Sequence, residues 1–250
     1  MAKLKLKKIN STDEPKSNEE AKLKQNKKPQ TKEKRNLKDI VDRNKLFTML
    51  YSGVEDDRNF RILYDMGIRN FLISYQYVQK KKLDVDNYVS LGVKFFVDSG
   101  AFTYMSDSKY SDFTIDDWEK QIVRYLNWAK RHKDIIFALA SLDIEMIVGG
   151  EQVQKWNEKY FEPFMLETGI PVCFVWHEEA TNLSWEQYCQ RYPYVGVSWA
   201  TEESDLNKGL EVLRVAEKYN TLVHGMAMTK TSVLYSRFNY MACWVTIWRN

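Results

Sequence analysis

The chain has 250 residues, enough for one large domain or two small ones, and its formal charge is +3 at pH 7. Its three cysteines are far apart and show no CxxC spacing, which indicates neither a zinc site nor a disulfide framework. No run of about 18 apolar residues occurs, and the N-terminus has no apolar core segment, so we expect neither a membrane span nor a signal peptide. We therefore expect a cytoplasmic protein.

The charge is distributed unevenly along the chain. Residues 1–36 hold twelve Lys or Arg and five Asp or Glu, whereas the remainder holds 25 basic and 29 acidic residues. The first segment has almost no apolar residues to bury, so we expect a disordered basic tail over 1–36 and one domain over 37–250. The tail is either an arm that binds nucleic acid electrostatically or a solvated segment that aids solubility.

From residue 46 onward, patterns typical of strands and helices alternate. The expected strands are 46–51, 70–75, 93–97, 135–140, 171–176, 194–199, 221–223 and 240–245. The expected helices are 56–66, 85–91, one from 114, 151–168 with Pro163 ending or kinking it, one from 184, 206–219 and 231–236. Eight strands in this order predict an α/β fold, a (β/α)8 TIM-type barrel with an incomplete C-terminal end. The alternative is a doubly wound sheet, although no GxGxxG motif follows the first strand.

The third strand ends in the loop Asp98-Ser99-Gly100-Ala101-Phe102. A carboxylate at the mouth of a buried strand is costly to desolvate unless it is paired or in use, and Gly100 lets the backbone approach a ligand. Asp98 could otherwise simply cap the turn. We expect this loop to form one wall of the functional site.

Other strands also end in polar or aromatic residues, and barrel enzymes carry their chemistry at this end. These strand-end residues are Ser52, Tyr75, Asp143 with Glu145, His177, Trp199 and His224. In one interpretation two carboxylates bind and protonate a polar heterocycle on which Phe102 stacks. In the other, Asp98, Asp143, His177 and His224 bind a divalent metal for hydrolysis. Each histidine could instead be a structural residue.

The loop from Asp98 to Phe102 resembles the Asp-Ser-Gly-Gly-aromatic loop of the tRNA-guanine transglycosylases, and the sequence is most similar to their phage and genomic-island branch. The resemblance implies a barrel that exchanges guanine for a deazaguanine in DNA or tRNA. It implies Asp98 as the acid or base and Asp143 as the residue that reads the base. It further implies that Phe102 and Met226 stack on the two faces of the base and that Gly196 lines the pocket. We also expect Ser99, Gly100, His177 and His224 to bind the substrate.

The resemblance lacks the family's nucleophile, because residues 240–250 contain no carboxylate. Cys243 would replace it only if its side chain faced the mouth. We therefore keep three hypotheses: a base-exchange enzyme of the pentosyltransferase type, a purine- or nucleic-acid-binding barrel without turnover, and a metal-dependent hydrolase. The first two need no cofactor or metal, and the host cytoplasm is the expected location if the chain is phage-encoded. A truncated gene product and a homodimer both remain open.

Overall fold

The computed structural model describes residues 36–41, 49–80, 83–197, 206–226 and 241–246. The chain divides into two compact units, Met1–Lys34 and Arg35–Asn250, and all the described residues belong to the second. Residues 1–35 of the predicted tail, the predicted helix 231–236 and Trp199 lie outside the described residues. For residues 206–208 and 241–246, only the backbone is described.

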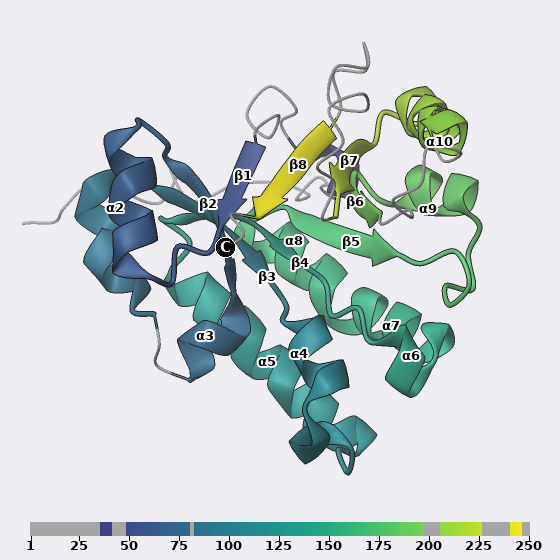
Figure 1. The fold of residues 1–250 in the computed structure, drawn as a ribbon. Helices are drawn as coiled ribbons and strands as arrows, with labels where there is room; N and C mark the ends of the chain where they lie inside the picture. The colour runs from purple at the N-terminus through teal and green to yellow at the C-terminus, as the bar shows by residue number, and fades with distance from the viewer. Residues whose placement is uncertain (1–35, 42–48, 81–82, 198–205, 227–240, 247–250) are drawn as a thin grey trace, which may run out of the picture. The chain divides into compact units, whose positions relative to one another are not determined.

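Eight parallel strands form the central sheet (Figure 1). They are β1 (Met49–Ser52), β2 (Asn70–Ser74), β3 (Lys94–Asp98), β4 (Ile136–Ala140), β5 (Val172–Trp176), β6 (Tyr194–Val197), β7 (Leu222–Gly225) and β8 (Met241–Thr246). Each strand pairs with its neighbour in chain order, and β8 pairs with β1 from Met49↔Cys243 to Ser52↔Thr246. The predicted α/β fold with a curled parallel sheet is confirmed.

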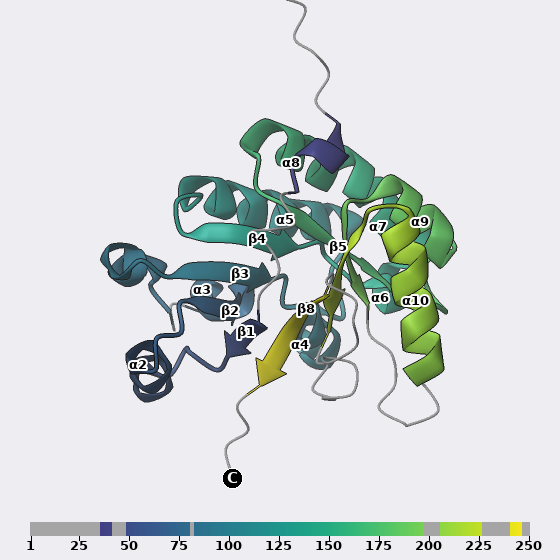
Figure 2. The same ribbon diagram turned by 90° about the horizontal axis from the view of Figure 1, so that it is seen from above.

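Helical segments connect the strands. They are η1 (Leu37–Asp39), α2 (Asp57–Asp65), α3 (Tyr75–Gln79), η2 (Val85–Leu91), α4 (Ala101–Ser106), η3 (Ser108–Tyr110), α5 (Ile115–Arg131), α6 (Glu145–Val148), α7 (Gly150–Trp156), η4 (Asn157–Phe161), α8 (Glu162–Thr168), α9 (Trp185–Arg191) and α10 (Leu206–Lys218). Figure 2 shows α2, α5, α9 and α10 arranged around the strands. The capping boxes predicted at Thr114 and Ser184 are both present.

The helix predicted over 151–168 is three helical segments instead of one. A π-helical turn, η4, separates α7 from α8, and Pro163 lies in the first turn of α8. Proline has no N–H and its ring clashes with the carbonyl four residues earlier, so an uninterrupted α-helix through this position would be strained. The wider π turn accommodates the proline and keeps the chain helical on both sides.

Apolar side chains fill both faces of the sheet. The larger cluster lies between the sheet and the helices and includes Phe71, Trp118 and Trp156. The smaller cluster fills the inside of the curled sheet and consists of Leu50, Leu72, Phe96, Ala138, Ala140, Cys173, Val175, Tyr194 and Leu222. The small alanines of β4 leave room for the large rings of β3 and β6, as packing inside a barrel requires.

Three short helices absent from the sequence prediction begin at strand ends: α3 after β2, α4 after β3, and α6 after β4. Figure 1 shows all three at the same end of the sheet, below the strands. A helix of four to six residues gives too little periodicity to be recognised in a sequence. Among the described residues, no helix has the length and apolar character needed to cross a membrane.

Candidate acid–base site

Asp98 is the last residue of β3, and the loop after it is built around its carboxyl group. The N–H of Gly100 donates to Asp98 Oδ2 over 3.1 Å. Gly100 has a φ of +88°, and a Cβ at this position would lie 2.5 Å from Cγ of Gln76 and 3.2 Å from Oγ of Ser74. The sharp turn that aims Asp98 therefore requires glycine at residue 100.

A second carboxyl group, from Asp143, is fixed beside the first. The Ser99 hydroxyl donates to Asp143 Oδ1 over 3.0 Å, so the loops after β3 and β4 are joined. Burial, and then the charge of Asp143, raise the pKa of Asp98 to about 7. Two neighbouring carboxyls resist simultaneous ionisation, which is the physical origin of the second effect.

His177 and Glu145 extend this group. The Nε2 atom of His177 lies 3.7 Å from Asp143 Oδ2 and 3.8 Å from Glu145 Oε2. The proximity of Asp143 and, to a smaller extent, the charge of Glu145 raise the pKa of His177, although burial of the ring opposes them. The Glu145 side chain is only 2% exposed, and burial raises its pKa to about 7. We call these four residues (Asp98, Asp143, Glu145 and His177) the acid–base cluster.

Two buried tyrosines fix the strand ends that carry the cluster. The hydroxyl of Tyr125, on α5, donates to the carbonyl oxygens of Val97 (2.9 Å) and Ala140 (3.1 Å), at the ends of β3 and β4. The hydroxyl of Tyr188, on α9, donates to the carbonyl of Val175 in β5, two residues before His177. These bonds satisfy carbonyl groups at the edge of the sheet, where the ladder ends.

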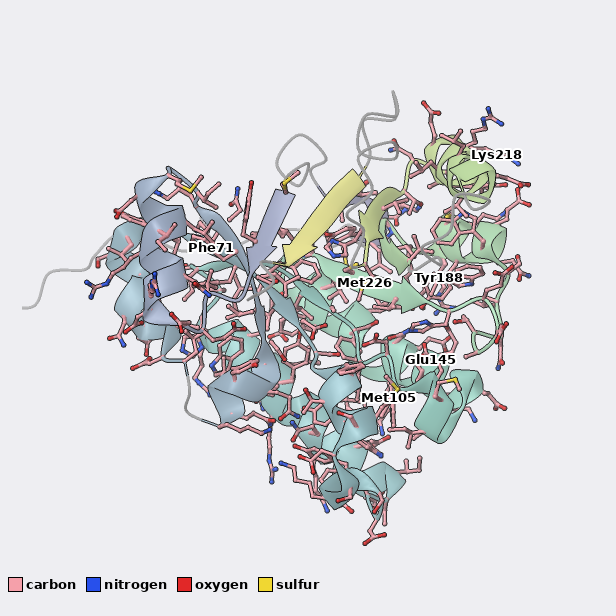
Figure 3. The ribbon with its side chains drawn as sticks, viewed as in Figure 1. Phe71, Met105, Glu145, Tyr188, Lys218 and Met226 are labelled. Atoms are coloured by element: carbon pink, nitrogen blue, oxygen red, sulfur yellow. The ribbon has the colours of Figure 1, made fainter. Side chains whose placement is uncertain are left out.

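The remaining predicted pocket residues lie in two places. Phe102, in the first turn of α4, is 80% exposed. Gly196 and Met226 lie together, because a Cβ on Gly196 would be 3.2 Å from Met226 Sδ and 3.2 Å from Cys173 Sγ. Figure 3 labels Met226 and Glu145 on the ribbon. The predicted roles of these residues in binding a base stay predictions.

His224 lies inside the sheet instead of beyond a strand end. β7 extends two residues past its predicted end, to Gly225, and includes His224. Its ring is fully buried, stacks on Phe96 with centroids 4.8 Å apart, and faces the Tyr194 hydroxyl at 3.3 Å. Burial lowers the pKa of His224 to about 4. The structure therefore separates His224 from the acid–base cluster by environment, although its predicted role has not been tested.

One acidic residue at the same end of the sheet was missed in the sequence. Glu55 follows β1 by three residues, and burial raises its pKa, while a backbone hydrogen bond at Ser74 opposes that effect. Ser74 pairs with Asp98 across β2 and β3. Glu55 follows the end of β1 by as many residues as Asp143 follows the end of β4. The search for polar residues after strand ends, which found Asp143, could therefore have found Glu55.

The described residues contain no group of three or more His, Cys, Asp or Glu side chains arranged to hold a metal ion. The hypothesis of a metal-dependent hydrolase therefore gains no support from the described part of the chain.

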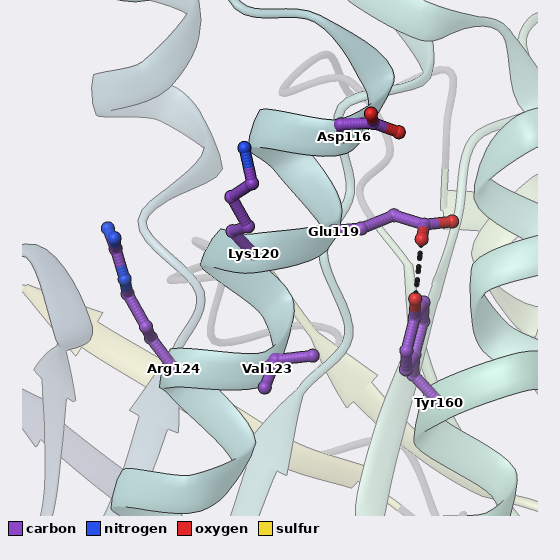
Figure 4. Close-up of a pocket in the computed structure, with 6 residues that line it drawn as sticks. All are labelled: Asp116, Glu119, Lys120, Val123, Arg124 and Tyr160. Carbon is purple, nitrogen blue, oxygen red and sulfur yellow. Dashed lines mark hydrogen bonds between the residues drawn. The ribbon is translucent and has the colours of Figure 1, made fainter.

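A concavity of about 450 Å³ lies elsewhere, along α5 and η4 (Figure 4). It is lined by Asp116, Glu119, Lys120, Val123, Arg124 and Tyr160. Its central carboxylate, Glu119, accepts hydrogen bonds from Trp156, Lys159 and Tyr160. These contacts tie the two helical segments together, so we assign Glu119 a structural role.

Comparison with known proteins does not assign the chain to a family. No family model and no curated protein matches the chain. A solved structure described as an enolase protein from environmental genome shotgun sequencing of the Sargasso Sea is similar, with a TM-score of 0.47 and 10% identity. The match covers 80% of this chain and 53% of the other, so the chain spans about half the length of that protein.

The proposed membership in the tRNA-guanine transglycosylases is wrong. No family model matches the chain, and no curated protein of that family or of any other does. The resemblance depended on one five-residue loop and on weaker motifs in the expected order. Many unrelated proteins contain a strand that ends in Asp, a turn that needs Gly, or an aromatic residue at the start of a helix. The combination of these three features in the loop therefore identified the end of a strand and not a family.

Proposed function

We propose that the protein binds a purine-type base at the carboxyl ends of β3 and β4, and that Asp98 transfers a proton to or from it. The observation that carries this proposal is that Asp98, whose pKa is about 7, lies beside Asp143. The Ser99 hydroxyl fixes Asp143 by a hydrogen bond of 3.0 Å to its Oδ1. A group that titrates near neutral pH is suited to donate and accept protons under those conditions. Perturbed carboxyl pairs of this kind are common at functional sites.

The chemistry of the cluster favours a base over a phosphate. Ionised carboxylates accept hydrogen bonds from ring and exocyclic N–H groups, and a protonated carboxyl donates to a ring nitrogen or carbonyl. The negative charge of Asp143 and its neighbours disfavours an anionic group. The exposed ring of Phe102 supports stacking, which contributes about 1–3 kcal/mol per base in other proteins.

The proposal includes a nucleic acid as the source of the base, bound by the twelve Lys and Arg of residues 1–36. In base exchange, Asp98 protonates the leaving base as its glycosidic bond breaks, and the incoming base forms the new bond to the anomeric carbon. The alternative is a barrel that binds the base and does not release it, because no nucleophile is assigned. A (β/α)8 TIM-type barrel with an incomplete C-terminal end and a cytoplasmic location belong to the same proposal.

The test uses the full chain with tRNA and with DNA that carry radiolabelled guanine, and it measures retention on a filter and release of the base. The Asp98→Asn variant should reduce release at least about 100-fold, the lower range for loss of a general acid. Asp112→Asn, at an exposed position, is the matched control. Retention without release would favour the binding alternative. No retention and no release with either nucleic acid would overturn the proposal.

A further inference from the structure

His177 presents one ring nitrogen to two carboxyl groups. Its Nε2 atom is 3.7 Å from Asp143 Oδ2 and 3.8 Å from Glu145 Oε2. Both distances are too long for a hydrogen bond but short enough for an ion pair.

Glu145 is the second unusual feature, because it is a buried acid with an unused oxygen. Its side chain is 2% exposed, and its Oε2 atom has no hydrogen-bond partner within the described part of the chain. A buried polar atom without a partner is costly, so it calls for an explanation. The imidazole of His177, whose Nε2 lies 3.8 Å away, is a described group that could satisfy Oε2.

Exposure differs along this row of groups. The His177 side chain is 38% exposed, whereas that of Asp143 is 10% exposed. The imidazole is therefore in contact with solvent on one side and faces the carboxyls on the other. Asp143 is in turn linked through Ser99 to the loop that carries Asp98.

We propose that His177 carries protons between solvent and the Asp98–Asp143 pair, and that Glu145 is a positioning residue that holds the imidazole in its charged form. In the transfer, the Nε2–H bond breaks and an O–H bond forms on Asp143 Oδ2. The neutral ring keeps its Nδ1–H and regains a proton at Nε2 from a hydronium ion of the solvent, which becomes water. This inference rests on the proposed function, since the pair that it supplies is the proposed acid–base pair.

Within the described part of the chain, two acidic side chains lie close to the His177 ring. Asp143 and Glu145 face it from the loop after β4 and from α6. On its own segment, Glu178 and Glu179 follow it and are exposed, and the His177 N–H donates to Thr181 Oγ1 over 3.0 Å. Glu179 therefore provides a matched control, because its removal changes the same charge at an exposed position.

The test is an NMR titration of the full chain, which has only three histidines, in the absence of any base or nucleic acid. In Glu145→Gln the titration midpoint of the His177 ring should fall by about 1 pH unit, the lower range for loss of an opposite charge at this distance. In Glu179→Gln it should stay near the wild-type value, and the ring of His132 serves as the internal reference. Equal midpoints in Glu145→Gln and in the wild type would overturn the role of Glu145.

A second variant, His177→Gln, changes a partly exposed side chain and does not depend on the buried Glu145. The measured quantity is the NMR chemical shift of the Asp98 carboxyl carbon as a function of pH. Because the imidazole and the carboxyl pair exchange protons, the midpoint of this curve should move in the variant. The curve should also lose the inflection that it shares with His177. A purely structural His177 would leave that curve unchanged, which would refute the relay. Base binding that persists without this coupling would refute the relay alone, whereas coupling without base binding would refute the proposed function.

Discussion

The hydroxyl of Ser99 donates a 3.0 Å hydrogen bond to Asp143 Oδ1 and thereby joins the loop after β3 to the loop after β4. The hydroxyl oxygen of Ser99 also accepts a hydrogen bond from the N–H of Ala101, at the start of α4, over 3.2 Å. One buried side chain therefore begins a helix and positions a carboxyl group of the acid–base cluster. The geometry of the Asp98–Asp143 pair depends on this residue.

Replacing Ser99 with alanine should loosen the cluster. Loss of a hydrogen bond to a charged group costs about 1.5–3 kcal/mol, so we expect the free energy of unfolding in urea to fall by about this amount. Affinity for guanine, measured by calorimetry, should fall about tenfold, because Asp143 is free to turn. Ser106→Ala removes an exposed hydroxyl that bonds only within α4, and it should leave both values unchanged. Unchanged affinity in Ser99→Ala would show that Asp143 is positioned by other contacts.

Gly100 should tolerate alanine much less well than a glycine of similar backbone conformation. Gly100 and Gly67 have φ values of +88° and +87°, so the strain of a left-handed alanine, about 1–2 kcal/mol, is common to both. Only at Gly100 does the added Cβ meet a neighbour, at 2.5 Å from Gln76, whereas Gly67 has nothing within 4 Å. Gly100→Ala should therefore lose more unfolding free energy than Gly67→Ala, by about 1–3 kcal/mol. Equal losses would show that Gln76 moves aside without cost.

Much of this architecture could be predicted because the sequence pattern and the physical cause coincide. Buried parallel strands are almost continuously apolar, so β3, β4 and β5 were found within a residue or two of their observed ends. Asp98, Asp143 and His177 followed from the rule that chemistry lies at the carboxyl ends of such strands. The rule placed them near one another without any knowledge of their side-chain contacts.

The rest depends on contacts between segments that are distant in sequence. Nothing around Tyr125 indicates that its hydroxyl bonds Val97 and Ala140, which are 28 and 15 residues away. His224 appeared to follow a strand because its polarity suggested a strand end, yet a neutral imidazole stacked on Phe96 is compatible with the interior. Polarity alone cannot distinguish these two environments.

Lys38, beside the predicted boundary of the domain, should be important for stability. Its ammonium group donates to the carbonyls of Cys189, Tyr192 and Tyr219 and to the Thr221 hydroxyl, over 2.7–3.1 Å. Lys38→Met keeps the aliphatic stem but leaves these oxygens without their charged donor, so unfolding free energy should fall by about 2–4 kcal/mol. Lys120→Met, at an exposed ion pair, should cost less than about 1 kcal/mol. Equal, small losses would mean that water replaces the ammonium group.

The acid–base cluster should make the protein less stable at high pH. The pKa of Asp98 rises on folding from an ordinary value of 3.8 to about 7, so the folded state binds the proton more tightly than the unfolded state. The contribution of Asp98 is therefore most favourable below pH 3.8, declines between 3.8 and 7, and stays unfavourable above 7. Asp98→Asn should be more stable than the wild type by about 1–3 kcal/mol at pH 8, and this advantage should shrink toward pH 4. Urea denaturation at several pH values measures it, with Asp112→Asn as the control; a constant difference would contradict the assignment.

The buried His224 should have the opposite effect and make the protein less stable at low pH. The pKa of His224 falls from 6.5 to about 4 because burial disfavours the charged ring, so the unfolded state binds this proton more tightly. Stability from the neutral ring is present above pH 6.5 and is lost as the pH falls toward 4. Over that range the wild type should lose about 3 kcal/mol more than His224→Phe, which stacks on Phe96 and does not titrate. His132→Gln, at a partly exposed surface ion pair with Asp86, should keep the acid sensitivity of the wild type. An equally acid-sensitive His224→Phe would show that groups other than His224 control unfolding in acid.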